Sequence, residues 1–232
     1  MSRLPVPVGF VLCCALALGA CGGGDDKSAS KGTPAPAATA TATPAGQAGC
    51  EKASEPKPGK AAKLAKPKLE LDAKTTYVAQ VVTNCGEFEI TLDAKRAPRT
   101  GGSFVTLVKK GFYDGLSFHR VVPGFVIQGG DPKGDGSGGP GYSVVEAPPE
   151  DLTYGKGVVA MAKTQTEEAG TSGSQFFVVT GEDAGLPPEY ALLGKVTKGQ
   201  DVVDRIGVTP AGRQDEKPLA PVVIRQIRIE ES

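Results

Sequence analysis

The sequence predicts a mainly β domain of antiparallel strands, arranged as a sandwich or a closed barrel. Three observations lead to this prediction. Short apolar or alternating segments recur from about residue 77 onward, glycine-rich connections separate them, and only two segments have helical periodicity. The first 75 residues differ in composition and are expected to lie outside this domain, which would span residues 76–232.

Eight segments of the domain are predicted to be strands. The clearest is residues 86–92, where Phe88, Ile90 and Leu92 fall on one face and polar residues on the other. The close spacing of the segments favours antiparallel pairing. The predicted strands are residues 76–84, 86–92, 117–122, 125–128, 157–162, 175–179, 191–197 and 222–229.

Two segments are predicted to be helices. The first follows Ala97, with Pro98 at the first helical position, and a second is expected over residues 200–206. Gly101 and Gly102 weaken the first helix by about 1 kcal/mol each relative to alanine. Its apolar side would consist of Phe104, Leu107 and Val108.

The N-terminus has the pattern of a secretory signal peptide over residues 1–20, with Arg3 before an apolar run. The alternative is a membrane-spanning helix, but the run is shorter than the roughly 20 residues that a span needs, and it contains two prolines. The run ends in Leu-Gly-Ala-Cys, which is similar to the lipobox of bacterial lipoproteins. That similarity implies lipidation of Cys21, export, and a lipid anchor on the extracytoplasmic face of the membrane. The alternative is ordinary cleavage after Ala20, which leaves a free thiol.

Residues 21–75 are rich in Pro, Ala, Thr and Gly and are expected to form a disordered stalk. Such a stalk would hold the domain away from the membrane surface. Two cysteines, Cys50 and Cys85, would remain beside Cys21 after export. In an oxidising compartment such a pair more often forms a disulfide than a metal site, and two cysteines are too few for closed zinc coordination. We therefore predict a Cys50–Cys85 disulfide and no metal site.

Several other functions are excluded by the sequence. Lys+Arg and Asp+Glu both number 26, so no basic surface for nucleic acid is expected. Residues 134–139 match G-x-G-x-x-G, but a turn and a strand follow instead of the helix that a dinucleotide site requires. A calcium loop starting at Asp131 fails, because Lys133 occupies a ligand position and Tyr142 replaces the bidentate glutamate.

Arg120 is a candidate functional residue, because it is expected to lie among apolar residues. Arg120 is expected on one strand face together with Phe118 and Val122, and the next strand brings in Gln128. An arginine in an ion pair at a barrel edge is the alternative, and the spacing alone does not exclude it. His119, the only histidine, would point to the opposite face and is interpreted as structural.

Two long motifs resemble the signatures of the cyclophilins. They are FHRVVPGFVIQGGD at residues 118–131 and GTSGSQFF at residues 170–177. The resemblance covers about residues 77–229 and implies a closed eight-stranded antiparallel barrel capped by two helices. It also implies a peptidyl-prolyl cis-trans isomerase without cofactor or metal. Shorter agreements occur at residues 112–115, 136–139, 158–162 and 193–196.

The resemblance also implies roles for individual residues. Arg120 would be the catalytic arginine, and Gln128 would order both Arg120 and the substrate carbonyl. The other implied contacts are the proline pocket of Phe125, Val126, Phe177 and Leu186, the backbone of Ala162 and Lys163, and a neighbouring groove with Gly136 and Gln175. The implied partners are extended proline-containing polypeptides. The protein is expected to be monomeric, to contact the membrane through lipid alone, and to bind no nucleic acid.

Two positions depart from the family pattern. Gly185 and Tyr190 stand where many members have Trp and His. Tyr190 would still close the pocket and offer a hydroxyl, whereas Gly185 removes a wall and puts cyclosporin binding in doubt. The alternatives to catalysis are a non-catalytic proline-peptide-binding module or holdase and, more weakly, a cell-wall or solute-binding lipoprotein.

Overall fold

The structure is a computed structural model and describes residues 49–57, 59 and 63–232. The expected signal peptide and Cys21 lie outside the described residues. Within the described part of the chain, no helix combines the length and apolar character needed to cross a membrane.

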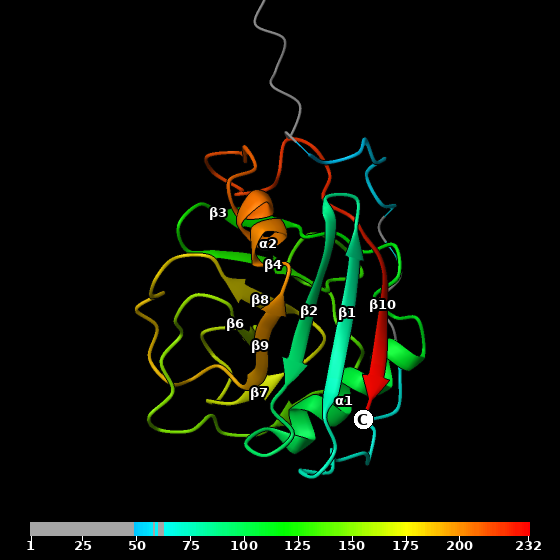
Figure 1. Cartoon of the computed structure of the whole chain (residues 1–232), viewed down its shortest axis with the longest axis vertical. Helices are drawn as coiled ribbons and strands as arrows, with labels where there is room; N and C mark the ends of the chain where they lie inside the picture. The colour runs from blue at the N-terminus through cyan, green and yellow to red at the C-terminus, as the bar shows by residue number, and fades with distance from the viewer. Residues whose placement is uncertain (1–48, 58, 60–62) are drawn as a thin grey trace, which may run out of the picture. The chain divides into compact units, whose positions relative to one another are not determined.

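Eight strands form one antiparallel sheet in the order β10-β1-β2-β9-β6-β8-β4-β3 (Figure 1). Each overlaps one of the eight predicted strands. Their bounds are β1 Tyr77–Thr83, β2 Gly86–Leu92, β3 Arg120–Val122, β4 Val126–Gly129, β6 Val158–Met161, β8 Phe176–Val179, β9 Leu192–Lys198 and β10 Ile224–Glu231. Two further short strands, β5 (Val144–Val145) and β7 (Thr171–Ser172), pair with each other.

The sheet is curled but open, so the expected closed barrel is corrected to a half-barrel. Its edge strands β3 and β10 do not pair along their lengths, and an isolated bridge between Ser117 and Val223 connects the segments beside them. The reason lies in the edge of β3. The backbone N–H of Val121 donates to the carbonyl oxygen of Glu216 at 2.8 Å, so the loop before β10 occupies the edge.

The sheet buries apolar side chains on both faces, which explains why β8 is buried along its whole length. On its neighbour β4, Ile127 belongs to the main core, whereas Val126 belongs to a second apolar cluster. The same alternation divides β8, where Val178 faces the main core and Phe177 the second cluster. The second cluster is the floor on which the site described below is built.

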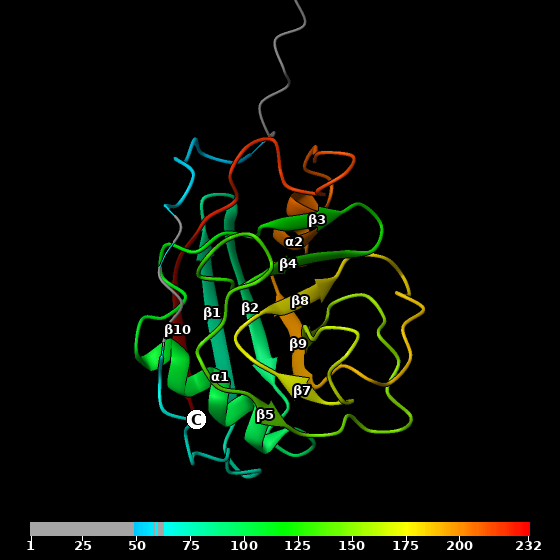
Figure 2. The same cartoon turned by 180° about the vertical axis from the view of Figure 1, so that it is seen from behind.

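Two helices cover opposite ends of the main core (Figures 1 and 2). Helix α1 spans Pro98–Lys109 and α2 spans Gln200–Gly207, and both confirm the predicted helices. The apolar side predicted for α1 is buried, with Phe104 and Leu107 fully inaccessible. Helix α2 buries Val202, Val203 and Ile206 against the same core.

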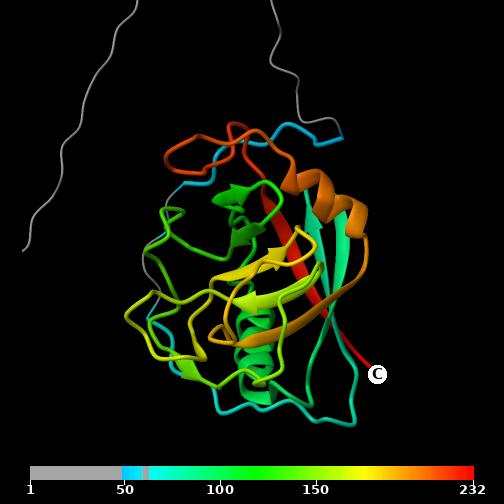
Figure 3. The ribbon, with the colours of Figure 1, turned by 90° about the vertical axis from the view of Figure 1, so that its left-hand side faces the viewer.

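The described residues between 49 and 75 form an irregular segment that we call the strap. It contacts the domain well before residue 76, where the stalk was expected to end. A disulfide joins Cys50 to Cys85, and the backbone N–H of Leu71 donates to the carbonyl of Pro98 at 3.1 Å. The part of the strap near Cys50 lies beside the loop of residues 208–223 (Figure 3), where Glu55 pairs with Lys217 at 2.7 Å. Hydrogen bonds, ion pairs and the disulfide therefore order this part of the predicted stalk.

Candidate active site

The β3–β4 hairpin places Arg120 opposite Gln128. The two residues are register partners, and Nη1 of Arg120 donates to Oε1 of Gln128 at 3.4 Å. The expectation that Phe118 shares this face is wrong, because the strand begins only at Arg120. Phe118 instead lies in the main core, with its ring centroid 5.9 Å from that of Phe176.

A chain of side-chain hydrogen bonds continues from this pair. Nε2 of Gln128 donates to Oε1 of Gln175 at 3.0 Å. Nε2 of Gln175 in turn donates to the carbonyl oxygens of Gly136 and Gly138, both at 2.9 Å. Two glutamines thus connect the β3–β4 hairpin with the glycine-rich run, and this network fixes their amide orientations.

A hollow of about 260 Å³, here called the first hollow, opens over the second apolar cluster. Arg120 lies on its lining, and the guanidinium carbon of Arg120 is 5.9 Å from the centroid of the Phe125 ring. Its apolar lining residues come from the second cluster and the side chains packed on it, and they offer contacts to a small apolar side chain such as proline. It is lined by Arg120, Phe125, Val126, Gln128, Ala162, Lys163, Gln165, Phe177, Leu186 and Tyr190. Apart from Gln165, all were candidates from the sequence.

Tyr154 supports this hollow from behind, and the sequence did not indicate it. Its hydroxyl donates to the carbonyl of Tyr190 at 2.7 Å and accepts from the N–H of Tyr190 at 3.0 Å. Burial raises the pKa of the Tyr154 hydroxyl to about 12, so it stays protonated at physiological pH. Tyr190 also packs edge-on against Phe177, at 5.5 Å between centroids. Tyr154 therefore holds the Tyr190 wall of the hollow by binding the backbone of Tyr190.

Lys163 contributes more than the backbone contact that the resemblance implied. Its side chain is only 4% exposed, and its Nζ lies 3.3 Å from a carboxylate oxygen of Glu189. The same Nζ lies 5.5 Å from the centre of the Tyr190 ring, a cation–π distance. The N–H of Ala162 already donates to the carbonyl of Gln175, so a bound peptide would have to use another group there.

A second hollow, of about 720 Å³, adjoins the first and shares Gln128, Ala162 and Lys163 with it. Gly136 and Gln175 line it, as the resemblance implied. Its wall is held by the buried carboxylate of Asp131, which accepts backbone N–H groups from Lys133, Asp135 and Gly136 at 2.6–3.1 Å. The glycine-rich run is thus shaped by Asp131.

Gly185 lines neither the first nor the second hollow. No atom lies within 4 Å of the position that a Cβ would take there, so this side is open. The structure thus places no wall at the position where many cyclophilins carry tryptophan.

His119 is buried beside the site and lines neither hollow. Neither ring nitrogen has a hydrogen-bond partner among the described residues. Burial lowers the pKa of His119, partly opposed by Asp131, and so favours the neutral ring. These facts agree with the structural interpretation of this residue.

Glu216 is a further site residue that the sequence did not indicate. Its Oε2 lies 2.5 Å from Nε of Arg120, and the two side chains are 39% and 33% exposed. Arg120 is therefore both an edge arginine in an ion pair and a wall of the first hollow. The two interpretations left open by the sequence are compatible.

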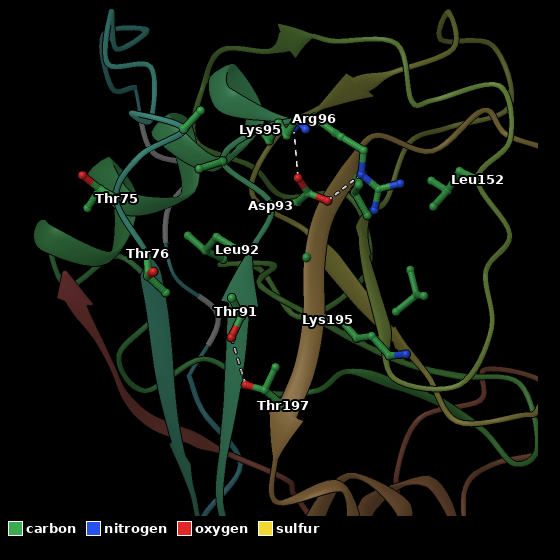
Figure 4. A pocket seen from close by; sticks show the side chains of 15 residues that line it. Thr75, Thr76, Thr91, Leu92, Asp93, Lys95, Arg96, Leu152, Lys195 and Thr197 are labelled. Atoms are coloured by element: carbon green, nitrogen blue, oxygen red, sulfur yellow. Dashed lines mark hydrogen bonds and ion pairs between the residues drawn. The ribbon is translucent and has the colours of Figure 1, made fainter. Parts of the chain in front are cut away.

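Another hollow, of about 430 Å³, lies beside β2 and β9 and shares no lining residue with the other two (Figure 4). Two pairs of its polar side chains contact each other. Asp93 pairs with Arg96 at 2.7 Å, and the hydroxyls of Thr91 and Thr197 lie 3.0 Å apart. No residue of either signature motif lines it, and its one arginine, Arg96, is paired with Asp93 inside the same hollow, so it is not the candidate site.

Comparisons with known proteins show which family has a similar sequence and fold. The family model of cyclophilin type peptidyl-prolyl cis-trans isomerase/CLD matches residues 78–229. The chain is 37% identical over 170 residues to peptidyl-prolyl cis-trans isomerase B of Streptomyces anulatus, covering 66% of this chain and 95% of the relative. It is 42% identical over 137 residues to a peptidyl-prolyl cis-trans isomerase of Helicobacter pylori, covering 58% and 82%.

A solved structure gives the same answer. The crystal structure of a cyclophilin type isomerase of Cryptosporidium parvum matches with a TM-score of 0.62 at 31% identity. The match covers 67% of this chain and 98% of that chain. The chain therefore belongs to the cyclophilin-type peptidyl-prolyl cis-trans isomerases, and isomerisation of the bond before proline is its activity.

Proposed function

We propose that Arg120 catalyses this isomerisation by hydrogen-bonding the prolyl nitrogen in the twisted transition state. The observation that carries the proposal is the Arg120 guanidinium on the lining of the first hollow, beside the Phe125 ring and above the second apolar cluster. A relative from Cryptosporidium parvum was crystallised in the presence of the dipeptide Ala-Pro, which fits a proline-sized site in this family.

The chemistry explains why an arginine suffices. Amide resonance sets a barrier of about 18–20 kcal/mol, and twisting the bond localises a lone pair on the prolyl nitrogen. A donor placed beside that nitrogen binds the twisted state better than either planar state, which is selective transition-state binding. Arginine stays charged and holds its donors in a rigid plane. The step needs no proton transfer and no covalent intermediate.

The lowering of the activation barrier that catalysis requires is larger than the contribution of one hydrogen bond. An acceleration of about 10⁵-fold corresponds to about 7 kcal/mol, whereas one charged hydrogen bond contributes about 1.5–3 kcal/mol. The remainder would come from the apolar walls, which exclude water, and from a held substrate carbonyl. The bonds of Gln128 to Arg120 and Gln175 support the second role for Gln128.

We also propose that the protein acts on exported, still-folding polypeptides while anchored to the membrane by lipid on Cys21. Support comes from the leader, the Leu-Gly-Ala-Cys sequence and the proline-rich segment after it. The mass of the mature protein tests this, because an unmodified Cys21 thiol would refute the anchor.

The catalytic proposal is tested by the cis-to-trans relaxation of an Xaa-Pro peptide with wild type and Arg120→Ala. We expect wild type to accelerate relaxation and the variant to lose at least about 100-fold in kcat/KM. Equal rates would remove Arg120 from the mechanism. No acceleration by wild type would favour a proline-peptide-binding module or holdase.

A further inference from the structure

We propose that Glu216 is a positioning residue that fixes the plane of the Arg120 guanidinium. The inference rests on the catalytic role proposed for Arg120. It concerns the loop of residues 208–223, far in sequence from both signature motifs.

The contact geometry defines the guanidinium plane. Glu216 accepts from Nε at 2.5 Å, and Gln128 accepts from Nη1 at 3.4 Å. These contacts use two different nitrogens of one planar group, so together they oppose rotation about its long axis. Three of the five N–H donors of the guanidinium are not used by these two contacts and are available to a peptide.

The backbone of Glu216 is held in an unusual conformation. Its φ of 54° makes it the one non-glycine residue with positive φ in the part of the chain that the structure describes. Its carbonyl accepts from Val121 at 2.8 Å, and its N–H donates to the carbonyl of Gly212 at 3.0 Å. An unfavourable conformation persists only where the surroundings enforce it, and here they place the carboxylate against Arg120.

The strap also contacts the loop of residues 208–223. Lys217, the next residue, pairs with Glu55 of the strap at 2.7 Å. The N–H of Gly212 donates to the carbonyl of Lys217 at 2.9 Å and closes the loop on itself. The loop is thus fixed to β3, to the strap and internally, which suits a part that must hold another side chain still.

Glu216 has two effects on catalysis with opposite signs. Its charge weakens the positive potential of Arg120, and its position orients the donors. Both side chains are about a third exposed, so water weakens the charge effect, whereas the orienting contact depends on the position of the two groups. Orientation therefore dominates, and removal of the carboxylate should slow the reaction.

The test compares Glu216→Ala and Glu216→Gln in the full chain, using an Xaa-Pro peptide. We expect Glu216→Ala to lower kcat by about tenfold, about 1.4 kcal/mol, with KM changed less than about twofold. Glu216→Gln keeps an acceptor oxygen and should recover kcat to within about threefold of wild type. The matched control is Glu231→Gln, which changes a glutamate of similar exposure, 42%, that pairs with Lys109 at 2.8 Å, and it should leave kcat unchanged.

A double-mutant cycle separates this inference from the one on which it rests. If Glu216 acts through Arg120, Glu216→Ala should cost nothing further in an Arg120→Ala background. Full activity of Arg120→Ala would defeat the catalytic role of Arg120 itself. A slow Arg120→Ala together with an unimpaired or faster Glu216→Ala would overturn only the role of Glu216.

A spectroscopic readout guards against a merely structural effect. The ¹H–¹⁵N signal of Arg120 Nε–H should shift in both Glu216 variants and stay in place in Glu231→Gln. An unmoved signal would overturn the inference even if activity fell. Should Glu216→Ala fail to fold, the Arg120 Nε–H signal of Glu216→Gln decides the question, and an unmoved signal there overturns the inference.

Discussion

The carbonyl oxygen of Leu69 lies 2.0 Å from the position that a Cβ on Gly102 would occupy. The strap therefore crosses helix α1 at a backbone-to-backbone distance that only glycine permits. The neighbouring Gly101 faces the strap as well, with the side chain of Leu71 2.4 Å from its virtual Cβ. The two glycines that weaken the helix in isolation are the docking surface for the strap.

Gly102→Ala is expected to lower the free energy of unfolding, although alanine favours a helix interior by about 1 kcal/mol. The new methyl would meet a backbone atom that cannot move without displacing the strap. Urea unfolding followed by circular dichroism measures the change. Gly101→Ala is the matched control and should lose less, because it meets the movable end of a leucine. A Gly102→Ala protein more stable than wild type would contradict this account.

Tyr154→Phe should raise KM severalfold and change kcat less. The substitution removes both hydrogen bonds to the backbone of Tyr190, and each buried group left unpaired costs about 1–3 kcal/mol. The wall of the first hollow would loosen, while Arg120 and Gln128 would keep their contacts. Steady-state kinetics on an Xaa-Pro peptide measure the effect. Tyr77→Phe, which loses one long bond at 3.3 Å away from the site, should behave as wild type.

Stability should fall as the pH drops below about 6.5, the pKa of an unfolded histidine. Burial lowers the pKa of His119 in the folded protein, so between the folded and unfolded values the unfolded chain binds more protons. The stabilisation that His119 contributes is complete above about pH 6.5 and is lost as the pH falls toward the pKa of His119 in the folded protein.

The dependence of the free energy of unfolding on pH can be assigned to His119, because it is the only histidine in the sequence. Denaturant unfolding at several pH values between about 5 and 7 measures it, above the range in which ordinary carboxylates titrate. His119→Gln should flatten the dependence in this window. An equally steep dependence in that variant would assign the effect to another group.

Reduction of the Cys50–Cys85 disulfide should destabilise the domain by about 3–4 kcal/mol. The bond closes a loop with a sequence separation of 35, and this figure follows from the chain entropy that the unfolded state regains. Chemical unfolding with and without a reductant measures the loss. A Cys50→Ala/Cys85→Ala variant should unfold at the reduced midpoint and ignore the reductant. Coinciding midpoints for oxidised and reduced wild type would refute the prediction.

Much of the fold was predictable because its signals are local. The alternation in residues 86–92 and Pro98 at the start of α1 each depend on near neighbours in sequence. The site was predictable from two motifs, since they contain Arg120, Gln128, Gln175 and Phe177 within short stretches. The predicted pairing of Cys50 with Cys85 followed from the small number of cysteines outside the leader.

Other features depended on contacts that no local pattern encodes. Phe118 was assigned to the wrong face because the strand starts at Arg120, three residues later than predicted. Glu216 lies 96 residues from Arg120, and Tyr154 lies 36 from Tyr190, so neither partner could be chosen from the sequence. The strap looked like disordered stalk, because its composition shows little apolar periodicity although single residues such as Leu71 are buried.

The sequence by itself determined the strands, the helices, the family and the arginine at the centre of the site. Only the tertiary structure decided that the sheet stays open, that the strap crosses α1, and that Glu216 pairs with Arg120. Residue periodicity fixes which side of an element is apolar, because it acts over a few residues. The pairing of distant edges and charges depends on the assembled fold, where the loop before β10 reaches the edge of β3 and brings Glu216 to Arg120.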